Sequence, residues 1–376
     1  MTESDFKELG STKEELLLKA CQKGQELVAL ALIDKGADIN ANVYIFVYAC
    51  RMRMEGVVAA LIEKGISLEQ HDNALLANAE TILPYACQFG LDGVISKLIE
   101  LDANVNTARN TLLHNAVYRG SEEIVTKLIE QGADVNAVSK LGRTPLHDAC
   151  YYGYERIIAA LIENGANVNV ADNDGNTPIR YVWNRGVAGI VKLIEHGANV
   201  NVADKNGYTP MHFACNRGDE ELVAKLIEHG ANVNPVDKHG DTPLHDAAAS
   251  GSEEIVAMLI EHGANVTAAN KHGNTPLHNA AASGFEEIVA MLIEHGANVT
   301  AANKHGDTPL HKAASEEIVA KLIEHGANVN APNKQGDTPL HNAASGGFEG
   351  ILAKLIEHGA NVNAPNKQGA TPLHNA

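Results

Sequence analysis

Hydrophobic and polar positions follow a pattern that returns along the chain at a fixed spacing. Residues 268–300 differ from residues 235–267 at only six of 33 positions, and the same pattern returns in 301–330 and 331–363. Each copy holds two apolar stretches with helical spacing, a glycine between them and a polar segment after them. This period predicts a solenoid, in which each repeat buries its apolar faces on its neighbours.

Each copy is predicted to form two short helices. In 268–300 the first helix opens at Thr275-Pro276, because a threonine hydroxyl can cap a helix and proline fits its first position. Gly284 ends this helix in the left-handed conformation. The second helix begins at Glu286, where a carboxylate favours the helix dipole, and 288–293 carries its apolar stripe.

The Thr-Pro-Leu-His pattern, the 33-residue period and the Gly-Ala-Asn-Val-Asn ending closely resemble the ankyrin repeat, over roughly residues 12–376. The resemblance implies an all-α fold class: an ankyrin-repeat solenoid of stacked helix-turn-helix units with β-hairpin loops. It also implies protein binding, through the hairpin tips and the concave face of the first helices.

The repeats differ in how well they keep the pattern. The predicted division is an N-terminal tail (1–11), a capping repeat (12–40), divergent repeats two to four (41–136), repeats five to seven (137–234), near-identical repeats eight to eleven (235–363) and a truncated repeat twelve (364–376). The first repeat has Lys13-Glu14 in place of Thr-Pro, which favours a polar cap. Repeat twelve lacks a second helix, so either the natural chain continues or it was cut within a repeat. We expect a frayed last helix at 371–376 and incomplete cover of Ile351 and Leu355.

Two deletions interrupt the period. Repeat six (170–201) lacks one residue around 187–189, and repeat ten (301–330) lacks three, in both cases in the loop between the two helices. For repeat ten we expect a tight loop, no glycine at the helix end, and local stacking that departs from repeat nine.

Composition and charge limit the function. The chain is 45% hydrophobic and 20% charged, as in folded soluble proteins. Its formal net charge of −18 argues against nucleic acid, whose affinity comes largely from lysine and arginine. The chain lacks both a secretory signal and the ~20 apolar residues that span a bilayer. We therefore expect no nucleic-acid or membrane partner, and a monomer.

The cysteines recur at one position of the first helix, which predicts small buried residues. They are Cys21, Cys50, Cys87, Cys150 and Cys215, and later repeats hold Ala248, Ala281, Ala314 and Ala344 there. Neighbouring copies should lie about 8–10 Å apart, too far for a disulfide. Reduced thiols without a secretory signal favour a cytoplasmic protein.

Histidines also recur once per repeat, and this regularity favours a structural role over a metal site or catalysis. Those of the Thr-Pro-Leu-His pattern are predicted to bridge backbone groups between adjacent hairpins, and those of the His-Gly dipeptides suit helix C-termini. Residues 172–175 faintly resemble a calcium loop, but Val170 and Tyr181 occupy ligand positions, so a hairpin tip is the better interpretation. We expect no metal, no cofactor and no enzymatic activity.

Positions that stacking does not fix hold aromatic residues and arginines in repeats four to seven. Eight of the 16 aromatic residues lie between 118 and 213. Tyrosine, tryptophan and arginine often dominate binding energy. The candidate partner-binding residues are Tyr118, Arg119, Tyr151, Tyr152, Tyr154, Tyr181, Arg185, Tyr208, Phe213 and Arg217. Trp183 replaces a small core residue or lies next to it, and the sequence leaves open whether it is buried.

The leading functional prediction is a cytoplasmic, non-catalytic scaffold or adaptor that binds a partner protein. One alternative is the targeting module of a longer effector or enzyme whose catalytic part lies beyond residue 376, which the length of the reading frame would reveal. Another is a structural spacer, favoured if affinity capture recovers no partner.

Overall fold

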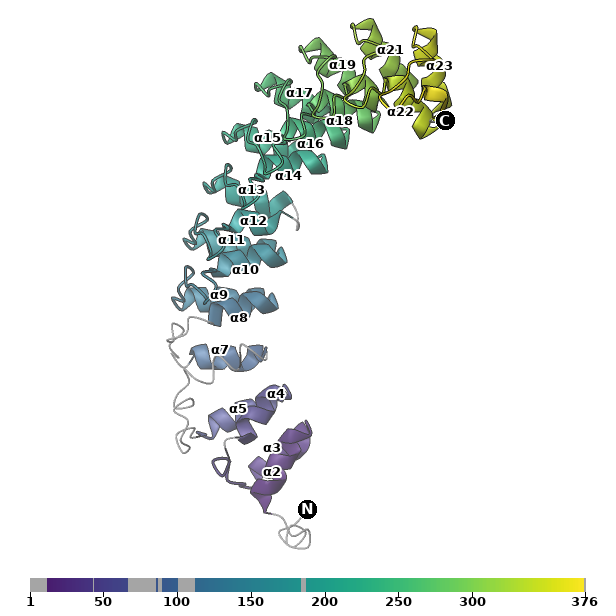
Figure 1. Cartoon of the computed structure of the whole chain (residues 1–376). Helices are drawn as coiled ribbons and strands as arrows, with labels where there is room; N and C mark the ends of the chain where they lie inside the picture. Colours follow the sequence, from purple (N-terminus) through teal and green to yellow (C-terminus); the bar gives the residue numbers. More distant parts are fainter. Residues whose placement is uncertain are drawn as a thin grey trace. The chain divides into compact units, whose positions relative to one another are not determined.

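The computed structural model describes residues 12–42, 44–66, 86, 90–100, 112–183 and 187–374 (Figure 1). All regular secondary structure in these residues is helical, so the predicted all-α fold class is confirmed. No helix among them is long and apolar enough to cross a bilayer. The chain divides into two compact units, Met1–His196 and Gly197–Ala376.

The described helices follow one another in pairs, one pair to a repeat, except in repeats three and twelve, where one helix is described. In the first unit they are α2 (Lys13–Gln22), α3 (Glu26–Asp34), α4 (Tyr44–Arg51), α5 (Glu55–Glu63), α7 (Asp92–Glu100), α8 (Leu112–Arg119), α9 (Glu122–Glu130), α10 (Pro145–Tyr152), α11 (Glu155–Glu163), α12 (Pro178–Val182) and α13 (Val187–Glu195). In the second unit they are α14 (Pro210–Arg217), α15 (Glu220–Glu228), α16 (Pro243–Ser250), α17 (Glu253–Glu261), α18 (Pro276–Ser283), α19 (Glu286–Glu294), α20 (Pro309–Lys312), α21 (Glu316–Glu324), α22 (Pro339–Gly346), α23 (Glu349–Glu357) and the 3₁₀ helix η1 (Pro372–His374).

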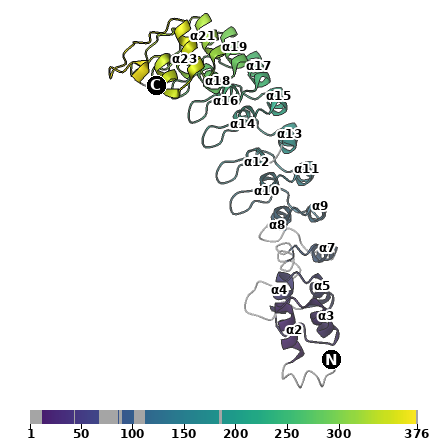
Figure 2. The same cartoon turned by 90° about the vertical axis from the view of Figure 1, so that its right-hand side faces the viewer.

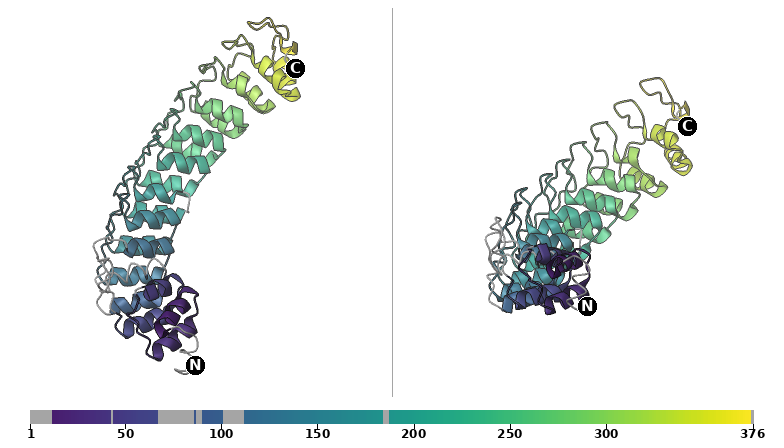
Figure 3. Two further views of the ribbon diagram at one scale, coloured as in Figure 1. Left: turned by 60° about the horizontal axis from the view of Figure 1, so that its bottom comes forward. Right: turned by 90° about the horizontal axis from the view of Figure 1, so that it is seen from below.

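Each repeat is a thin layer whose core is completed by its neighbours. In the second unit α16 packs against both α14 and α18, and α17 packs against α15 and α19 (Figures 2 and 3). Repeat eight buries Leu244 and Ala248 of its first helix and Ile255 and Leu259 of its second completely. The apolar positions that the pattern predicted therefore form the core.

A threonine–histidine clamp joins each regular repeat to the next. In repeat eight the Thr242 N–H donates to His245 Nδ1 at 3.1 Å, and the Thr242 hydroxyl lies 2.9 Å from the same nitrogen. His245 Nε2 donates to the Asn274 carbonyl of repeat nine at 3.0 Å. The same set of contacts is made by His147, His212, His278, His311 and His341. The predicted bridging role of these histidines is confirmed.

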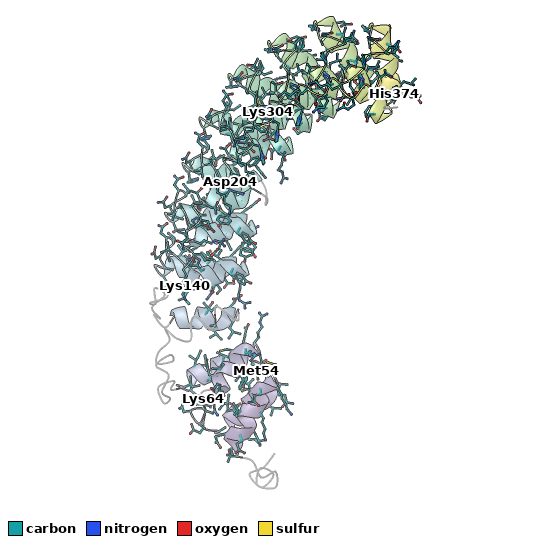
Figure 4. All side chains as sticks on the ribbon, viewed as in Figure 1. Met54, Lys64, Lys140, Asp204, Lys304 and His374 are labelled. Atoms are coloured by element: carbon teal, nitrogen blue, oxygen red, sulfur yellow. The ribbon has the colours of Figure 1, made fainter. Side chains whose placement is uncertain are left out.

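The polar segment between repeats forms a hairpin turn that contacts the next hairpin through its backbone. In repeat eight the Asp237 N–H donates to the Asp241 carbonyl at 3.0 Å, and in the next hairpin the Lys271 N–H donates to the His239 carbonyl at 2.8 Å. Gly240 has a φ of +80°, and a Cβ there would lie 2.9 Å from the Lys271 nitrogen, so only glycine fits. The tip lysines are exposed, as at Lys304 (Figure 4).

The cysteines that the structure describes are buried in first helices, as predicted. Burial raises the pKa of the Cys21 and Cys50 thiols to about 12 and also raises the pKa of Cys150 and Cys215. All four are free thiols. Cys87 lies outside the described residues.

The deletion in repeat ten shortens its first helix. Helix α20 has only four residues and ends at Lys312, with Ala313 rather than a glycine as its C-cap. The Ser315 hydroxyl caps α21 by accepting from the Ile318 N–H at 3.2 Å. The tight loop and the missing glycine are confirmed. The prediction that Ala314 is a core residue is wrong: it is exposed, because the deletion removes the last helical turn. Its N–H donates to the Ala281 carbonyl instead, at 3.0 Å.

Apolar side chains are exposed in the first and the last described repeats. Leu27 and Val28 of α3 are 83% and 50% exposed, beside the polar residues that favoured a cap. In repeat eleven Ile351 and Leu355 are buried, which contradicts the expected incomplete cover. The exposed apolar side chain of α23 is Ile356, with 49% of its surface exposed. Ile351 and Leu355 are covered because α23 packs against α21 of the preceding repeat and α22 of its own repeat. The expected last helix is reduced to the three-residue η1.

An asparagine at the end of several described repeats makes a second bridge. In repeat seven Asn234 Nδ2 donates to the Gly263 carbonyl at 2.9 Å, and its Oδ1 accepts from the Asn265 N–H at 2.8 Å. Repeats eight and nine hold Thr267 and Thr300 at this position, and each hydroxyl donates back to an asparagine of its own repeat at 2.8 Å.

We expect Thr267→Asn to raise the free energy of unfolding by about 1–2 kcal/mol, because it supplies two hydrogen bonds to the next repeat. The shift in urea midpoint, followed by far-UV circular dichroism, measures this gain. Thr267→Ser keeps the local hydroxyl bond and adds no bridge, so it serves as the control. An asparagine variant no more stable than the serine variant would contradict the prediction.

Candidate binding surface

Five of the predicted tyrosines form one cluster in the first unit, where α10 lies between α8 and α12 (Figure 2). The rings of Tyr118 and Tyr152 meet edge to face, with centroids 5.6 Å apart. Tyr152 also contacts Tyr151 edge to face at 5.0 Å and stacks on Tyr154 at 5.6 Å. Tyr181 joins the cluster through Tyr151, at 6.1 Å. These separations are those of favourable aromatic pairs.

Two members anchor the cluster to the repeats. Tyr154 precedes α11 and lies over the turn at Gly120 of the preceding repeat, where an added Cβ would fall 2.8 Å from its ring. The Tyr181 hydroxyl donates to the Asp172 carboxylate in the hairpin of its own repeat. The Arg143 guanidinium covers the Tyr181 ring, 4.8 Å from its centroid, and lies 3.7 Å from the same carboxylate. Tyr154 and Tyr181 therefore serve stacking as well as the surface.

The remaining tyrosines present the surface to solvent. Tyr118 is 65% exposed and Tyr151 is 43% exposed. Burial raises the pKa of Tyr152 above the usual range of a phenol, and the neighbouring Tyr118 and Asp148 raise it further. Tyr152 therefore stays neutral at physiological pH, and its hydroxyl can both donate and accept a hydrogen bond.

The charged groups beneath the cluster are already engaged. Asp148 Oδ2 lies 2.7 Å from His114 Nδ1, and His114 Nε2 lies 3.0 Å from the Ala137 carbonyl. Burial and then the hydrogen bond with Asp172 raise the pKa of Tyr181, while the pKa of Asp172 is lowered by its hydrogen bonds, against the effect of burial. The cluster is thus an aromatic surface with hydroxyl groups rather than a site for a strongly charged ligand.

The other predicted residues lie apart from this cluster or outside the described residues. Arg119 is exposed and lies over the turn at Gly90, where an added Cβ would fall 2.7 Å from its guanidinium. Arg185 lies outside the described residues. Tyr208, Phe213 and Arg217 belong to the second unit.

The second-unit residues form a smaller aromatic group. The Tyr208 ring stacks on His212 with centroids 5.0 Å apart, and its hydroxyl donates to the His212 carbonyl at 3.3 Å. Burial raises the pKa of Tyr208. The Arg217 guanidinium lies 5.4 Å from the Phe213 ring centroid. Tyr208 therefore supports its own repeat. Phe213 is half-buried like Tyr208, and Arg217 is exposed beside it.

Trp183 is buried, with 2% of its surface exposed, which settles the question that the sequence left open. It fills the position of the small residue of the first helix and lies beneath the Arg180 guanidinium, 4.4 Å away. Sequence reasoning missed Arg143, Asp172 and His114 as supports of the surface. Their contacts depend on how each hairpin folds back on its own helix, which residue spacing does not reveal.

The described residues hold no group of three histidine, cysteine, aspartate or glutamate side chains that could bind a metal ion. Their arrangement instead provides a row of first helices with variable side chains, carried on a stack of nearly constant repeats. The fold and the surface therefore define a class of protein: a helical-repeat solenoid in which constant residues stack the repeats and variable residues form the surface.

Comparison with known proteins identifies the repeat. The family model for ankyrin repeats, which represents three copies, matches residues 46–139, 113–204, 180–270, 267–333 and 315–376. The chain therefore belongs to the ankyrin repeat family. Among solved structures, the crystal structure of the human ASB11 ankyrin repeat domain matches this chain with 31% sequence identity and a TM-score of 0.50. The match covers 57% of this chain and 98% of the ASB11 chain. No curated protein shows a significant match.

Membership of this family fixes the general kind of function. Ankyrin repeats generally mediate protein–protein interaction, and the fold is typically a non-catalytic interaction module.

Proposed function

We propose that this chain is a non-catalytic, cytoplasmic adaptor that acts as a monomer and binds a partner protein through the first helices of repeats four to six. The observation that carries the proposal is the tyrosine cluster, in which Tyr118 and Tyr151 are exposed while Tyr154 and Tyr181 hold the rings in place. Rigid aromatic residues give a large contact area at a low entropic cost, and they dominate many interfaces.

The contrast with repeats eight to eleven supports this location. Those repeats hold small or polar residues where Tyr151 and Tyr152 stand, such as Ala249 and Ser250 in repeat eight and Ala282 and Ser283 in repeat nine. They keep the stacking residues and lack aromatic residues at these two positions. The aromatic residues are therefore not required by the repeat itself, which favours a role in recognition.

The double variant Tyr118→Ala/Tyr152→Ala tests the proposal. Affinity capture with the whole chain identifies partners, and titration then gives the dissociation constant. Loss of a binding hot spot costs about 2 kcal/mol or more, so we expect affinity to fall at least about 30-fold. Circular dichroism checks that the variant is folded.

Phe348→Ala is the matched control, because Phe348 is also an exposed aromatic residue, at 51%, but lies in the second unit. It should bind like the unmodified chain. A folded tyrosine variant with unchanged affinity would refute this surface, and equal losses in both variants would point to a general effect of surface aromatic residues.

A further inference from the structure

Repeat six lacks the threonine–histidine clamp. Thr177 occupies the threonine position, but Arg180 stands where repeats four, five and seven to twelve have histidine. A guanidinium has only donors, so it cannot accept from a threonine N–H as an imidazole nitrogen does. The Thr177 hydroxyl oxygen is buried and has no hydrogen-bond partner. A buried polar atom of this kind lowers the stability of the repeat that holds it.

The core of repeat six is also rearranged. Its first helix, α12, has five residues, whereas α10 and α14 on either side have eight. Val182 and Trp183 replace Ala149 and Cys150 of repeat five. The second helix compensates with Gly189, where an added Cβ would lie 2.7 Å from the Val182 side chain.

This compensation weakens the second helix. Gly189 stands where repeat five has the buried Ile157, so an apolar side chain is lost and a flexible residue is placed near the start of α13. Repeats five and seven, by contrast, keep complete clamps at Thr144–His147 and Thr209–His212. Repeat six is thus intrinsically weaker than the repeats on either side.

In a repeat stack, cooperativity depends on the stability of each repeat and on the coupling between neighbours. We propose that repeat six divides the stack into two cooperative folding units, Met1–His196 and Gly197–Ala376, which unfold independently. The boundary between the two compact units lies at the end of this repeat, directly after α13. Because the tyrosine cluster lies wholly in the first unit, a partner bound there stabilises only that unit, a consequence that rests on the proposed function.

The chain carries its own reporter for this proposal. Trp183 is the single tryptophan and is buried in repeat six, so its fluorescence follows the first unit, whereas far-UV circular dichroism follows both. In urea we expect Trp183 to follow only part of the ellipticity change. The experiment needs no partner, so its result does not depend on the proposed function.

Two matched substitutions decide the outcome. His278→Arg places the defect of repeat six in repeat nine, and it should lower the ellipticity midpoint of the second unit by about 0.5–1 M urea without moving the Trp183 midpoint. Arg180→His restores the clamp residue and should raise the Trp183 midpoint by a similar amount. Even complete unfolding of the second unit by His278→Arg leaves Trp183 native under this proposal. A Trp183 midpoint that falls together with the ellipticity midpoint in His278→Arg overturns it.

Discussion

Lowering the pH from about 7.5 to about 5 should destabilise the stack steeply, because the clamp histidines must be neutral to work. Burial lowers the pKa of His147, His212, His245, His278 and His311, against the opposing effect of their hydrogen bonds to backbone carbonyls. In each clamp the carbonyl can only accept, so Nε2 carries the proton and Nδ1 accepts from threonine. A second proton on Nδ1 removes that acceptor.

The direction of the effect follows from proton linkage. A histidine whose pKa is lower in the folded chain than the ordinary value of about 6.5 binds fewer protons when folded than when unfolded. Stability therefore rises with pH through this range and falls as the pH drops below the ordinary value. Loss of one buried hydrogen bond costs about 1–3 kcal/mol, and several clamps respond together.

Urea midpoints measured at several pH values between about 5 and 7.5 check this expectation. His278→Gln should be less stable at neutral pH and should show a shallower pH dependence, because glutamine does not titrate. The control replaces the exposed hairpin histidines His239, His272 and His305 with glutamine, which repeats eleven and twelve already carry as Gln335 and Gln368. The prediction is wrong if the control flattens the acid profile as much as the clamp variant does.

The clamps also show how far the sequence could predict the fold. The Thr-Pro starts, the glycine helix ends and the bridging histidines are local features that recur in every regular repeat, so one copy predicts the others. The first helices of repeats five to eleven begin at those prolines, and the histidines contact the next hairpin. The tight loop of repeat ten and its missing glycine followed from aligning the copies.

Features that depend on contact between different copies could not be predicted in this way. Ala314 aligns with core alanines, yet it is exposed because the deletion shortens α20 and not only the loop. The Tyr181–Asp172 contact needs the hairpin to fold back on α12. The tyrosines were predicted individually, whereas their assembly into one cluster, and the position of Phe213 and Arg217 in another compact unit, came from the structure.

The residue that follows the clamp histidine also depends on contacts between different copies. This position holds Asn279 in repeat nine and Asn342 in repeat eleven, and each side-chain amide donates to a histidine carbonyl of the preceding repeat at 3.2 Å. Repeat eight holds Asp246 there. One oxygen of Asp246 is buried without a hydrogen-bond partner. Burial, together with the nearby Asp241 and Asp237, raises the pKa of Asp246 to about 8.

Asp246→Asn should therefore stabilise the second unit at alkaline pH by about 1–3 kcal/mol, the cost of a buried group without a partner. A carboxyl with a raised pKa binds more protons in the folded chain than in the unfolded chain, so its contribution falls as the pH rises from about 4 to about 8. The gain from asparagine should accordingly be large at about pH 8.5 and small at about pH 5.5. Ellipticity midpoints in urea at the two pH values measure the difference.

Asp148→Asn is the matched control, because Asp148 occupies the same position in repeat five but contacts His114 at 2.7 Å. Removing its charge weakens that pair, so this variant should be no more stable than the unmodified chain at either pH. Stabilisation by Asp246→Asn that is equal at both pH values would show that the carboxylate charge is not the cause. A variant destabilised at alkaline pH would show that Asp246 has a partner that its charge requires. With the expected result, removal of Asp246 flattens only the alkaline side of the stability profile, while the acid side remains set by the clamp histidines.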